Sequence, residues 1–265
     1  MFMTNSKSCL VISALLLLFF AGSRTAPRSQ AVASTEFPLE LDHVFVWVTK
    51  GAPEAQALQQ AGLQLQPETH QHTGQGTASK IFIFENVYLE LIWIEDEQAA
   101  TKNAARSGID MLRRSRWKQT GASPFGVGLH RKSAEGGELP FPVRLYWAEW
   151  MKPDTTIEFA QTVSNATEPM YFVLPDYISI GSPAVQARLK ETVKTSPHQL
   201  GVSRLTDLKI VTTGSRLTST SEMLTRGGVV KVERGSAPIA QLTLDGGRQG
   251  KSVDLRPGLP LVLKY

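Results

Sequence analysis

Two ionisable residues interrupt apolar, strand-like runs, and they are the first candidates for chemistry. In the run 39–48 (LELDHVFVWV), alternate residues share one face of a strand, which places His43 on an otherwise apolar face. In the run 87–94 (VYLELIWI), the same alternation isolates Glu90. Burying a charge on such a face is costly unless the charge is paired or coordinates a metal. The sequence therefore predicts that His43 and Glu90 each have a polar partner.

The chemistry open to this pair is metal binding or proton transfer. A histidine nitrogen and a carboxylate oxygen are suitable ligands for a divalent ion such as Zn, Mn, Fe or Ni. Glu90 is the candidate catalytic carboxylate, because a carboxylate beside a metal can shuttle a proton. The alternative is structural: a plain His–Glu hydrogen bond, or a His43 that merely caps its strand.

Further residues could extend such a site. They are His70, His72, His130 and Glu149. The pair H-x-H at 70–72 shares a face in extended chain, but it lies in a polar, glycine-bearing segment where solvated histidines are common. His130 ends an apolar run and Glu149 sits between tryptophans, so surface positions are the alternative for both. His198 follows Pro197 and is interpreted as structural.

The elements that must position these residues follow a β-α-β-β-β order. We expect a strand at 39–48, a helix at 54–61 ended by Gly62, a short strand at 63–66, a loop at 67–79, and strands at 80–84 and 87–94. The stretch 95–118 has acids at its start and Arg and Lys near its end, as a helix favours. It is predicted to be one helix.

The second half alternates short apolar runs with Pro- and Gly-rich connections. Strands are predicted at 125–129, 143–147, 157–160, 170–174, 205–211, 229–233, 239–244 and 261–264, and helices at 183–194 and 219–226. A second β-α-β-β-β unit begins either at Leu205 or at Phe125. Each unit leaves one sheet face uncovered, so two units must pair to bury it.

The N-terminal segment is typical of an export signal. Lys7 precedes an apolar run at 10–22, which is too short for a comfortable membrane span. We expect residues 1–33 to be signal peptide and linker and residues 37–265 to be the mature domain, secreted or periplasmic. The alternative is an N-terminal membrane anchor. No membrane contact is expected beyond this segment.

Composition limits the remaining function classes. Lys7, Arg24 and Arg28 account for three of the four net positive charges, so the rest of the chain carries +1 and no nucleic-acid partner is implied. The only cysteine, Cys9, lies in the leader, which excludes a disulfide or a cysteine-ligated metal downstream. Nucleotide-binding glycine loops, a G-x-S-x-G elbow and an H-E-x-x-H helix are absent from the sequence.

Several motifs together resemble the first module of glyoxalase-like proteins of the vicinal oxygen chelate superfamily. They are LDHV at 41–44, a helix ending in glycine, and YLEL at 88–91. Between them, HTGQGTAS at 72–79 resembles the H-x-x-x-G-T-x-N signature of one branch, with Ser79 at the Asn position. SPFG at 123–126 resembles the start of that branch's second half.

The resemblance implies an α+β fold of paired βαβββ modules that form a concave mixed sheet. The first module would span about 39–120, and an irregular second half about 121–265. It implies a small-molecule site inside the sheet. The residues implied are His43, Glu90, His72 and His130 as ligands of a divalent metal and Thr77, Ser79, Tyr88 and Trp47 as ligand-binding residues.

The second half lacks the acid that such a metal site takes from each module. If Leu205 opens that half, Asp207 stands at the histidine position and the closing strand 261–263 has no acid. If Phe125 opens it, the run 171–174 (YFVL) has none. Either water and substrate would complete the coordination, or the site has no metal.

Two functional hypotheses follow. One is a metal-dependent lyase, isomerase or dioxygenase that acts on a small oxygenated molecule. The other is a non-catalytic binding protein of the same fold. A third polar group that converges on His43 and Glu90 favours the enzyme, and an apolar ring around them favours the binder. The sequence indicates no oligomeric state.

Overall fold

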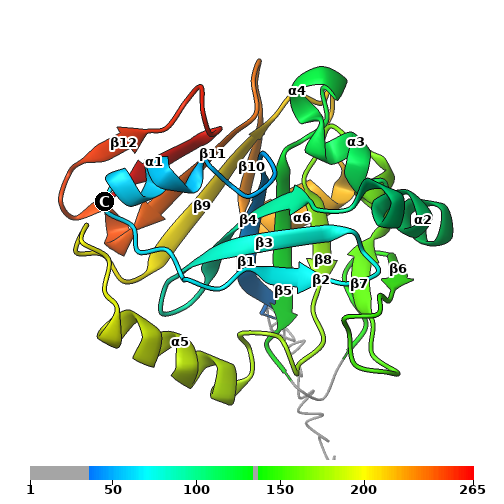
Figure 1. The fold of residues 1–265 in the computed structure, drawn as a ribbon, viewed down its shortest axis with the longest axis horizontal. Helices are drawn as coiled ribbons and strands as arrows, with labels where there is room; N and C mark the ends of the chain where they lie inside the picture. The colour runs from blue at the N-terminus through cyan, green and yellow to red at the C-terminus, as the bar shows by residue number, and fades with distance from the viewer. Residues whose placement is uncertain (1–35, 134–136) are drawn as a thin grey trace, which may run out of the picture. The chain divides into compact units, whose positions relative to one another are not determined.

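The computed structural model describes residues 36–133 and 137–265, and Glu36–Tyr265 form one compact unit (Figure 1). The predicted leader lies outside the described residues. Two sheets make up the unit, with strand orders β2-β3-β4-β1-β5-β8-β7-β6 and β10-β9-β11-β13-β12.

The first module has the predicted β-α-β-β-β order. It comprises β1 (Leu39–Trp47), α1 (Ala55–Gln60), β2 (His70–His72), β3 (Thr77–Ile83) and β4 (Tyr88–Ile94). The parallel pairing of β1 with β4 brings the first and last strands of the module together. Two details differ from prediction: Leu65 makes only an isolated bridge to Phe82, and the expected loop contains β2.

The second module begins at Phe125 and continues the same sheet. It comprises β5 (Phe125–Arg131), β6 (Val143–Tyr146), β7 (Ile157–Ala160) and β8 (Met170–Val173), with a 3-10 turn at Gln161–Ser164. Here β5 pairs with β8 in parallel, as β1 does with β4, and β1 and β5 meet antiparallel at the centre. The paired-module fold is confirmed. This half is irregular because the described residues between β5 and β6 contain no helix.

The C-terminal segment is not a further module of this kind. It comprises β9 (Leu205–Thr212), α6 (Ser219–Arg226), β10 (Lys231–Arg234), β11 (Ile239–Leu244), a 3-10 turn (Asp245–Gly247), β12 (Ser252–Asp254) and β13 (Leu261–Lys264). After the crossover helix α6, β10 pairs directly with β9 in parallel, whereas β2 in the first module lies at the sheet edge away from β1. The alternative that began the second module at Leu205 is therefore wrong.

The prediction of a single helix at 95–118 is also wrong, because three shorter helices occupy this stretch. These are α2 (Glu97–Ser107), α3 (Met111–Ser115) and α4 (Trp117–Thr120). Gly108 adopts the left-handed conformation that ends α2, and the Asp110 side chain accepts from Arg113 N–H to begin α3. Helix α5 (Pro183–Thr195) begins after Ser182 with proline in its first turn.

Strand alternation gives the eight-stranded sheet two different faces. Val44, Val46, Leu89 and Leu91 point to a core shared with the five-stranded sheet, where they pack with residues such as Ile210. The opposite face carries a second apolar cluster with Phe45, Trp47, Ile92, Phe159 and Phe172. The five-stranded sheet thus covers one face and leaves the other to line a cavity.

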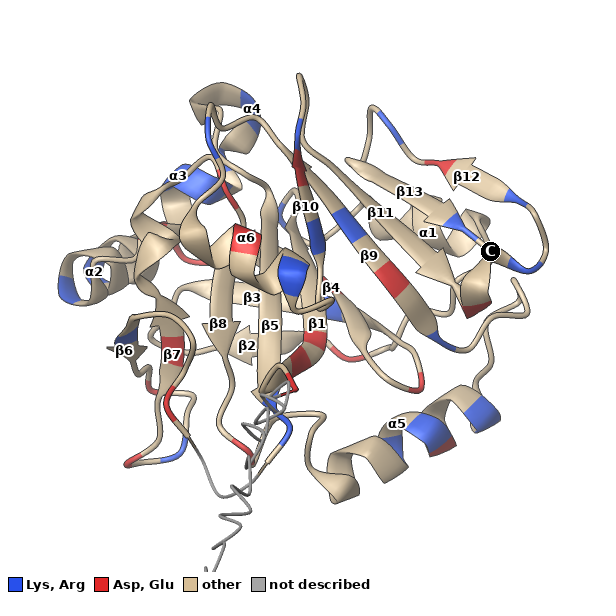
Figure 2. Cartoon of the chain, turned by 180° about the vertical axis from the view of Figure 1, so that it is seen from behind, with Lys and Arg blue, Asp and Glu red and all other residues tan. Residues whose placement is uncertain are grey.

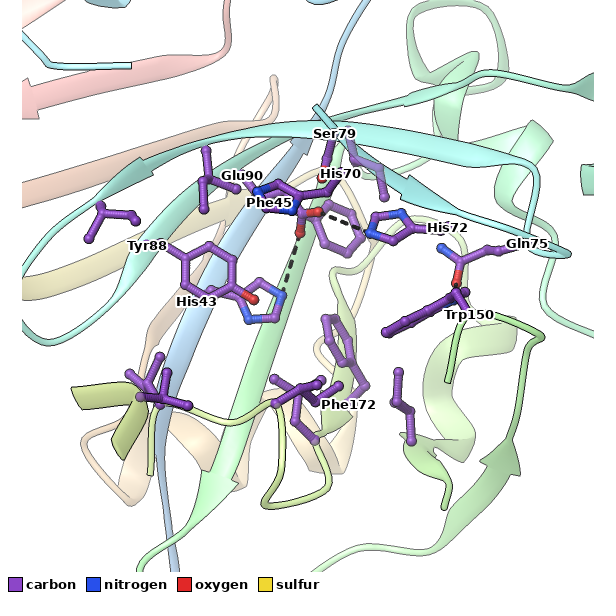
Figure 3. Close-up of a pocket in the computed structure, with 18 of the residues that line it drawn as sticks. His43, Phe45, His70, His72, Gln75, Ser79, Tyr88, Glu90, Trp150 and Phe172 are labelled. Atoms are coloured by element: carbon purple, nitrogen blue, oxygen red, sulfur yellow. Dashed lines mark hydrogen bonds and ion pairs between the residues drawn. The ribbon is translucent and has the colours of Figure 1, made fainter. Parts of the chain in front are cut away.

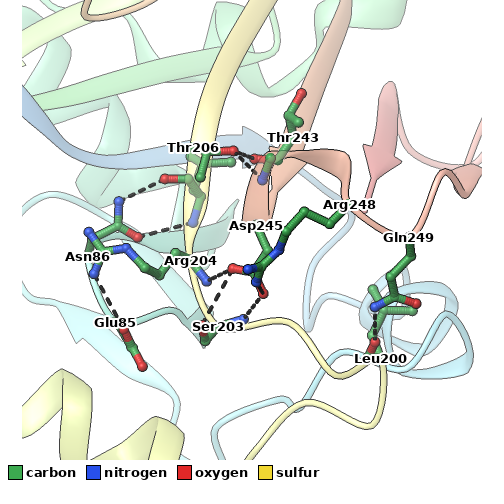
Figure 4. Close-up of polar contacts among 12 residues, drawn as sticks. Glu85, Asn86, Leu200, Ser203, Arg204, Thr206, Thr243, Asp245, Arg248 and Gln249 are labelled. Atoms are coloured by element: carbon green, nitrogen blue, oxygen red, sulfur yellow. Dashed lines mark hydrogen bonds and ion pairs between the residues drawn. The ribbon is translucent and has the colours of Figure 1, made fainter.

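Polar contacts join the two sheets at the β3–β4 turn (Figure 4). Asn86 donates from Nδ2 to the Leu205 carbonyl at 2.8 Å and accepts from Leu205 N–H at 3.1 Å. Glu85 N–H donates to the Ser203 carbonyl at 2.8 Å. Asp245 accepts from the N–H groups of Ser203 and Arg204, so the start of β9 is held on both sides.

Basic and acidic residues are interspersed over the strands and helices (Figure 2). A screen of the described helices for a long apolar membrane span identified none.

Candidate functional site

A β-bulge places Asp42 beside His43. The β1–β5 register shifts between Leu41 and His43. The side chains of Asp42 and His43, which would point to opposite faces of a regular strand, therefore lie close together. Oδ1 of the fully buried Asp42 lies 2.9 Å from Nδ1 of His43, and its Oδ2 accepts from Ser179 Oγ at 2.9 Å and Ile180 N–H at 2.8 Å. Since an ionised carboxylate only accepts, Nδ1 of His43 carries a proton and Nε2 is left free.

The free nitrogen of His43 faces Glu90. The two side chains come from the neighbouring parallel strands β1 and β4, and Nε2 lies 3.6 Å from Oε2 of Glu90 (Figure 3). Glu90 is buried, with 7% of its surface exposed. The pair predicted from the sequence therefore meets on the concave face.

His72 is the third polar group that approaches this pair. Its Nε2 lies 4.0 Å from Oε1 of Glu90, and its Nδ1 lies 2.9 Å from Thr77 Oγ1, which also accepts from Gln75. Burial lowers the pKa of His72, and Glu90 opposes this shift by favouring the charged form. The neutral imidazole is therefore the favoured form in this environment.

Aromatic rings fix the position of His43. Tyr88 stacks on the imidazole with ring centres 4.4 Å apart, and Phe172 meets its edge at 5.3 Å. Burial raises the pKa of Tyr88 well above its usual value, and the carboxylates of Asp42 and Glu90 add to the effect. The Tyr88 phenol therefore stays protonated and able to donate a hydrogen bond.

Strand β5 makes room for these side chains with two glycines. A Cβ on Gly128 would lie 2.4 Å from Cε1 of His43, and one on Gly126 would lie 2.1 Å from Cε1 of Phe45. Both distances are shorter than real contacts allow. The second module thus contributes space at its first strand and an apolar ring, Phe172, at its last.

The cluster opens into a cavity of about 630 Å³. Its polar wall is formed by His43, His70, His72, Gln75, Ser79 and Glu90, and its apolar walls include Phe45, Trp47, Ile81, Ile83, Ile92, Met111, Trp150, Phe159, Met170, Phe172, Ile178, Val185 and Leu189. Such a cavity, mostly apolar with a few convergent polar groups, is typical of a small-molecule site.

The predicted ligand-binding residues divide into two groups. Trp47, Ser79 and Tyr88 line the cavity, and Trp47 Nε1 and Ser79 Oγ are buried without a hydrogen-bond partner among the described residues. Thr77 does not line it but orients His72.

The remaining candidates lie elsewhere. His130 lines a separate polar cleft, where its Nε2 lies 3.3 Å from Glu40 and its Nδ1 3.7 Å from Asp42. Glu149 is exposed. His198 is structural, with Nδ1 accepting from Gln64 N–H at 2.8 Å.

Sequence reasoning missed three contributors to the site. Asp42 was overlooked because a bulge leaves no periodic signal, although the residue stands inside LDHV. Gln75 accepts from Trp150 Nε1 at 3.2 Å, and the two residues come from segments far apart in the sequence. Helix α5 lines the cavity as well, which only the three-dimensional arrangement reveals.

The donors fit only a partial metal site. Both His43 and His72 have Nδ1 held by an oxygen and Nε2 turned toward Glu90, an outer-shell arrangement that metal-ligating histidines share. Within the described ranges, however, no three His, Cys, Asp or Glu side chains lie so as to enclose a metal ion. The residues fit an ion held by His43 and Glu90 with water and substrate, and do not fit four protein ligands.

Residues 41–227 match the model of a protein family described as "Glyoxalase-like domain". A search of curated proteins found no match. Among solved structures, a hypothetical protein from Staphylococcus aureus aligns with a TM-score of 0.50 and 13% identity over 85% of this chain and 98% of its own. At this identity, the likeness shows the fold alone.

Two further structures align with lower scores. A hypothetical protein from Bacillus halodurans has a TM-score of 0.30 and 13% identity over 51% of this chain and 92% of its own. A mutant of 4-hydroxymandelate synthase from Streptomyces coelicolor has a TM-score of 0.31 and 13% identity over 85% of this chain and 62% of its own.

Proposed function

The chain belongs to the glyoxalase-like domain family of the vicinal oxygen chelate superfamily, and we propose that it binds a small oxygenated molecule with an apolar body and catalyses proton transfer to and from that molecule. The observation that carries this proposal is the Asp42–His43–Glu90 cluster, buried at the wall of an apolar cavity. Ionisable groups are costly in such surroundings, which favours a functional reason for them.

The proposed roles follow from the hydrogen bonds. Asp42 orients His43 by accepting from Nδ1–H, so that the free Nε2 takes a proton from the bound molecule. Glu90, facing the same space, shuttles a proton at a second position. The Tyr88 phenol and the Ser79 hydroxyl donate to oxygens of the ligand, while the apolar walls exclude water.

A second candidate is a metal-assisted reaction, and the matched orientation of the His43 and His72 imidazoles favours it. His43 and Glu90 would hold a divalent ion such as Zn, Mn, Fe or Ni. When bound, the ion would polarise oxygens of the substrate. Elemental analysis of the purified protein tests this candidate: we expect metal in the unsubstituted protein and less in His43→Ala. Equal, near-zero metal in both would contradict it.

The binding step is tested with N-phenylnaphthylamine, an uncharged apolar fluorophore. We expect it to bind the protein at one site with increased fluorescence, because the cavity offers an apolar volume of suitable size. Absence of binding would overturn the proposed cavity function.

The catalytic step is tested by deuterium exchange in heavy water. The probes are 2-oxo acids and hydroxyketones with an aromatic or aliphatic tail, followed by NMR at the carbon next to the carbonyl. We expect exchange with the unsubstituted protein and a loss of about 100-fold or more in His43→Ala, the usual scale of general-base catalysis. Probe binding without any exchange would favour the non-catalytic binder.

We further propose that residues 1–33 direct export. Mass spectrometry of the protein from its native envelope would show an N-terminus near residue 34 after signal cleavage. An intact Met1 in an envelope-bound protein would instead favour the membrane anchor.

A further inference from the structure

Helix α5 presents one mixed face to the cavity. Val185, Arg188, Leu189 and Thr192 line it, at the spacing of residues on a single helix face. Val185 and Leu189 are buried, whereas Arg188 is exposed. The apolar side chains therefore close the cavity wall, and the guanidinium stands at its solvent-exposed rim.

Among the described residues that line this cavity, Arg188 is the only lysine or arginine. Across the described ranges, no carboxylate pairs with it and no hydrogen bond involves its side chain. The other basic residues of α5, seen in Figure 2, differ: Lys194 pairs with Glu191 at 3.6 Å, and Lys190 lines the separate polar cleft.

Glu90, the one carboxylate among the described lining residues, makes no ion pair with Arg188. Glu90 belongs to β4, where the imidazoles of His43 and His72 face it at 3.6 and 4.0 Å. The cavity thus has an unpaired cation at the rim, apolar walls, and a carboxylate that lies apart from this cation among the imidazoles of β1 and β2. A complementary ligand carries a negative charge at one end of an apolar body.

We propose that Arg188 determines specificity by binding the anionic group of an amphipathic ligand, whose apolar body fills the cavity. This inference rests on the proposed small-molecule function and adds the ligand class: an organic anion such as a carboxylate with an aromatic or aliphatic body. A guanidinium suits this role because its planar donors match the oxygens of such a group. At an exposed rim the contribution is modest and sensitive to salt.

Two fluorophores that differ by one charged group test the inference. Anilinonaphthalene sulfonate has the ring body of N-phenylnaphthylamine plus a sulfonate. We expect the sulfonate to bind the unsubstituted protein more tightly. Arg188→Gln should weaken the sulfonate about three- to tenfold, the scale of a partly exposed charge interaction, and leave the uncharged probe unchanged. Lys190→Gln, on the same helix but outside the cavity, is the matched control.

The outcomes separate this inference from the proposed function. Failure of both probes to bind the unsubstituted protein overturns the cavity function, and the inference with it. Normal binding of the uncharged probe, together with equal sulfonate affinity in Arg188→Gln and the unsubstituted protein, overturns the role of Arg188 alone. An equal loss in Lys190→Gln also overturns it, because the effect would then be one of general charge. Circular dichroism of each variant shows that it is folded.

Discussion

The orientation of His43 depends on the carboxylate of Asp42. It accepts from a hydroxyl, a backbone N–H and an imidazole, and it is fully buried. Asp42→Asn replaces one acceptor oxygen by a donor, so at least one of these donors loses its partner. We expect a loss of about 1–3 kcal/mol in the free energy of unfolding. Urea denaturation measures it, with the exposed Asp176→Asn as control, and equal stabilities would contradict the expectation.

Another buried imidazole, His198, gives the fold a defined acid sensitivity. Burial lowers its pKa below the usual value of 6.5, and its Nδ1 accepts from Gln64 N–H, which a protonated ring cannot do. The unfolded chain therefore binds more protons just below pH 6.5, and the free energy of unfolding falls as the pH falls through this window. Urea titrations from neutral to mildly acid pH should show this fall. It should be smaller in His198→Asn, and an identical pH dependence in both proteins would contradict the assignment.

At the residue scale, the sequence predicted the pair but not its surroundings. His43 and Glu90 could be found because each breaks the apolar alternation of a strand, and the parallel pairing of β1 with β4 brought them together. Asp42 could not, since it shares the side of His43 only through a bulge. His130 does not line the cavity, because its side chain lies in the other cleft beside Glu40 and approaches the cluster only at Asp42.

At the scale of elements, strand β5 leaves space for the site because two of its residues are glycines without side chains. Gly128→Ala would place a Cβ 2.4 Å from the imidazole of His43, so the ring must move or the strand must shift. We expect a loss of about 1–3 kcal/mol in stability, typical of overpacking, and weaker binding of the uncharged probe. Gly137→Ala, where a Cβ meets no atom within 4 Å, is the control. Unchanged stability and probe binding in Gly128→Ala would contradict this account.

Strand and helix signals predicted most elements but not which of them pair. The β-α-β order at 205–233 looked like a repeat of the first module, yet β10 lies beside β9 instead of at a distant edge. Alternation identifies a strand without naming its neighbour. The prediction of one helix at 95–118 was wrong for a local reason: Gly108 ends one helix and Asp110 begins the next, within three residues.

At the scale of the whole molecule, the five-stranded sheet contributes to stability and the eight-stranded sheet carries the cavity. The five-stranded sheet buries the convex face of the paired modules, so that their concave face needs no covering layer and is available to a ligand. The contacts of Asn86 with Leu205 fix the sheets together at one end. Glu168, fully buried, accepts from Thr218 and Ser221 at the start of α6 and fixes another point.

A shared core predicts that the two sheets unfold together. Leu242 on β11 is fully buried in that core, and Leu242→Ala should cost about 2–5 kcal/mol. All five tryptophans lie between residues 47 and 150, so their fluorescence reports only on the eight-stranded part. If unfolding is cooperative, this distant substitution lowers the urea midpoint seen by tryptophan fluorescence, in one transition that coincides with circular dichroism. The exposed Lys264→Ala on β13 should leave the midpoint unchanged. The contrary result is a urea midpoint by tryptophan fluorescence that is the same in Leu242→Ala and the unsubstituted protein, together with an earlier transition in circular dichroism. It would mean that the five-stranded sheet unfolds on its own and that the cavity does not depend on it.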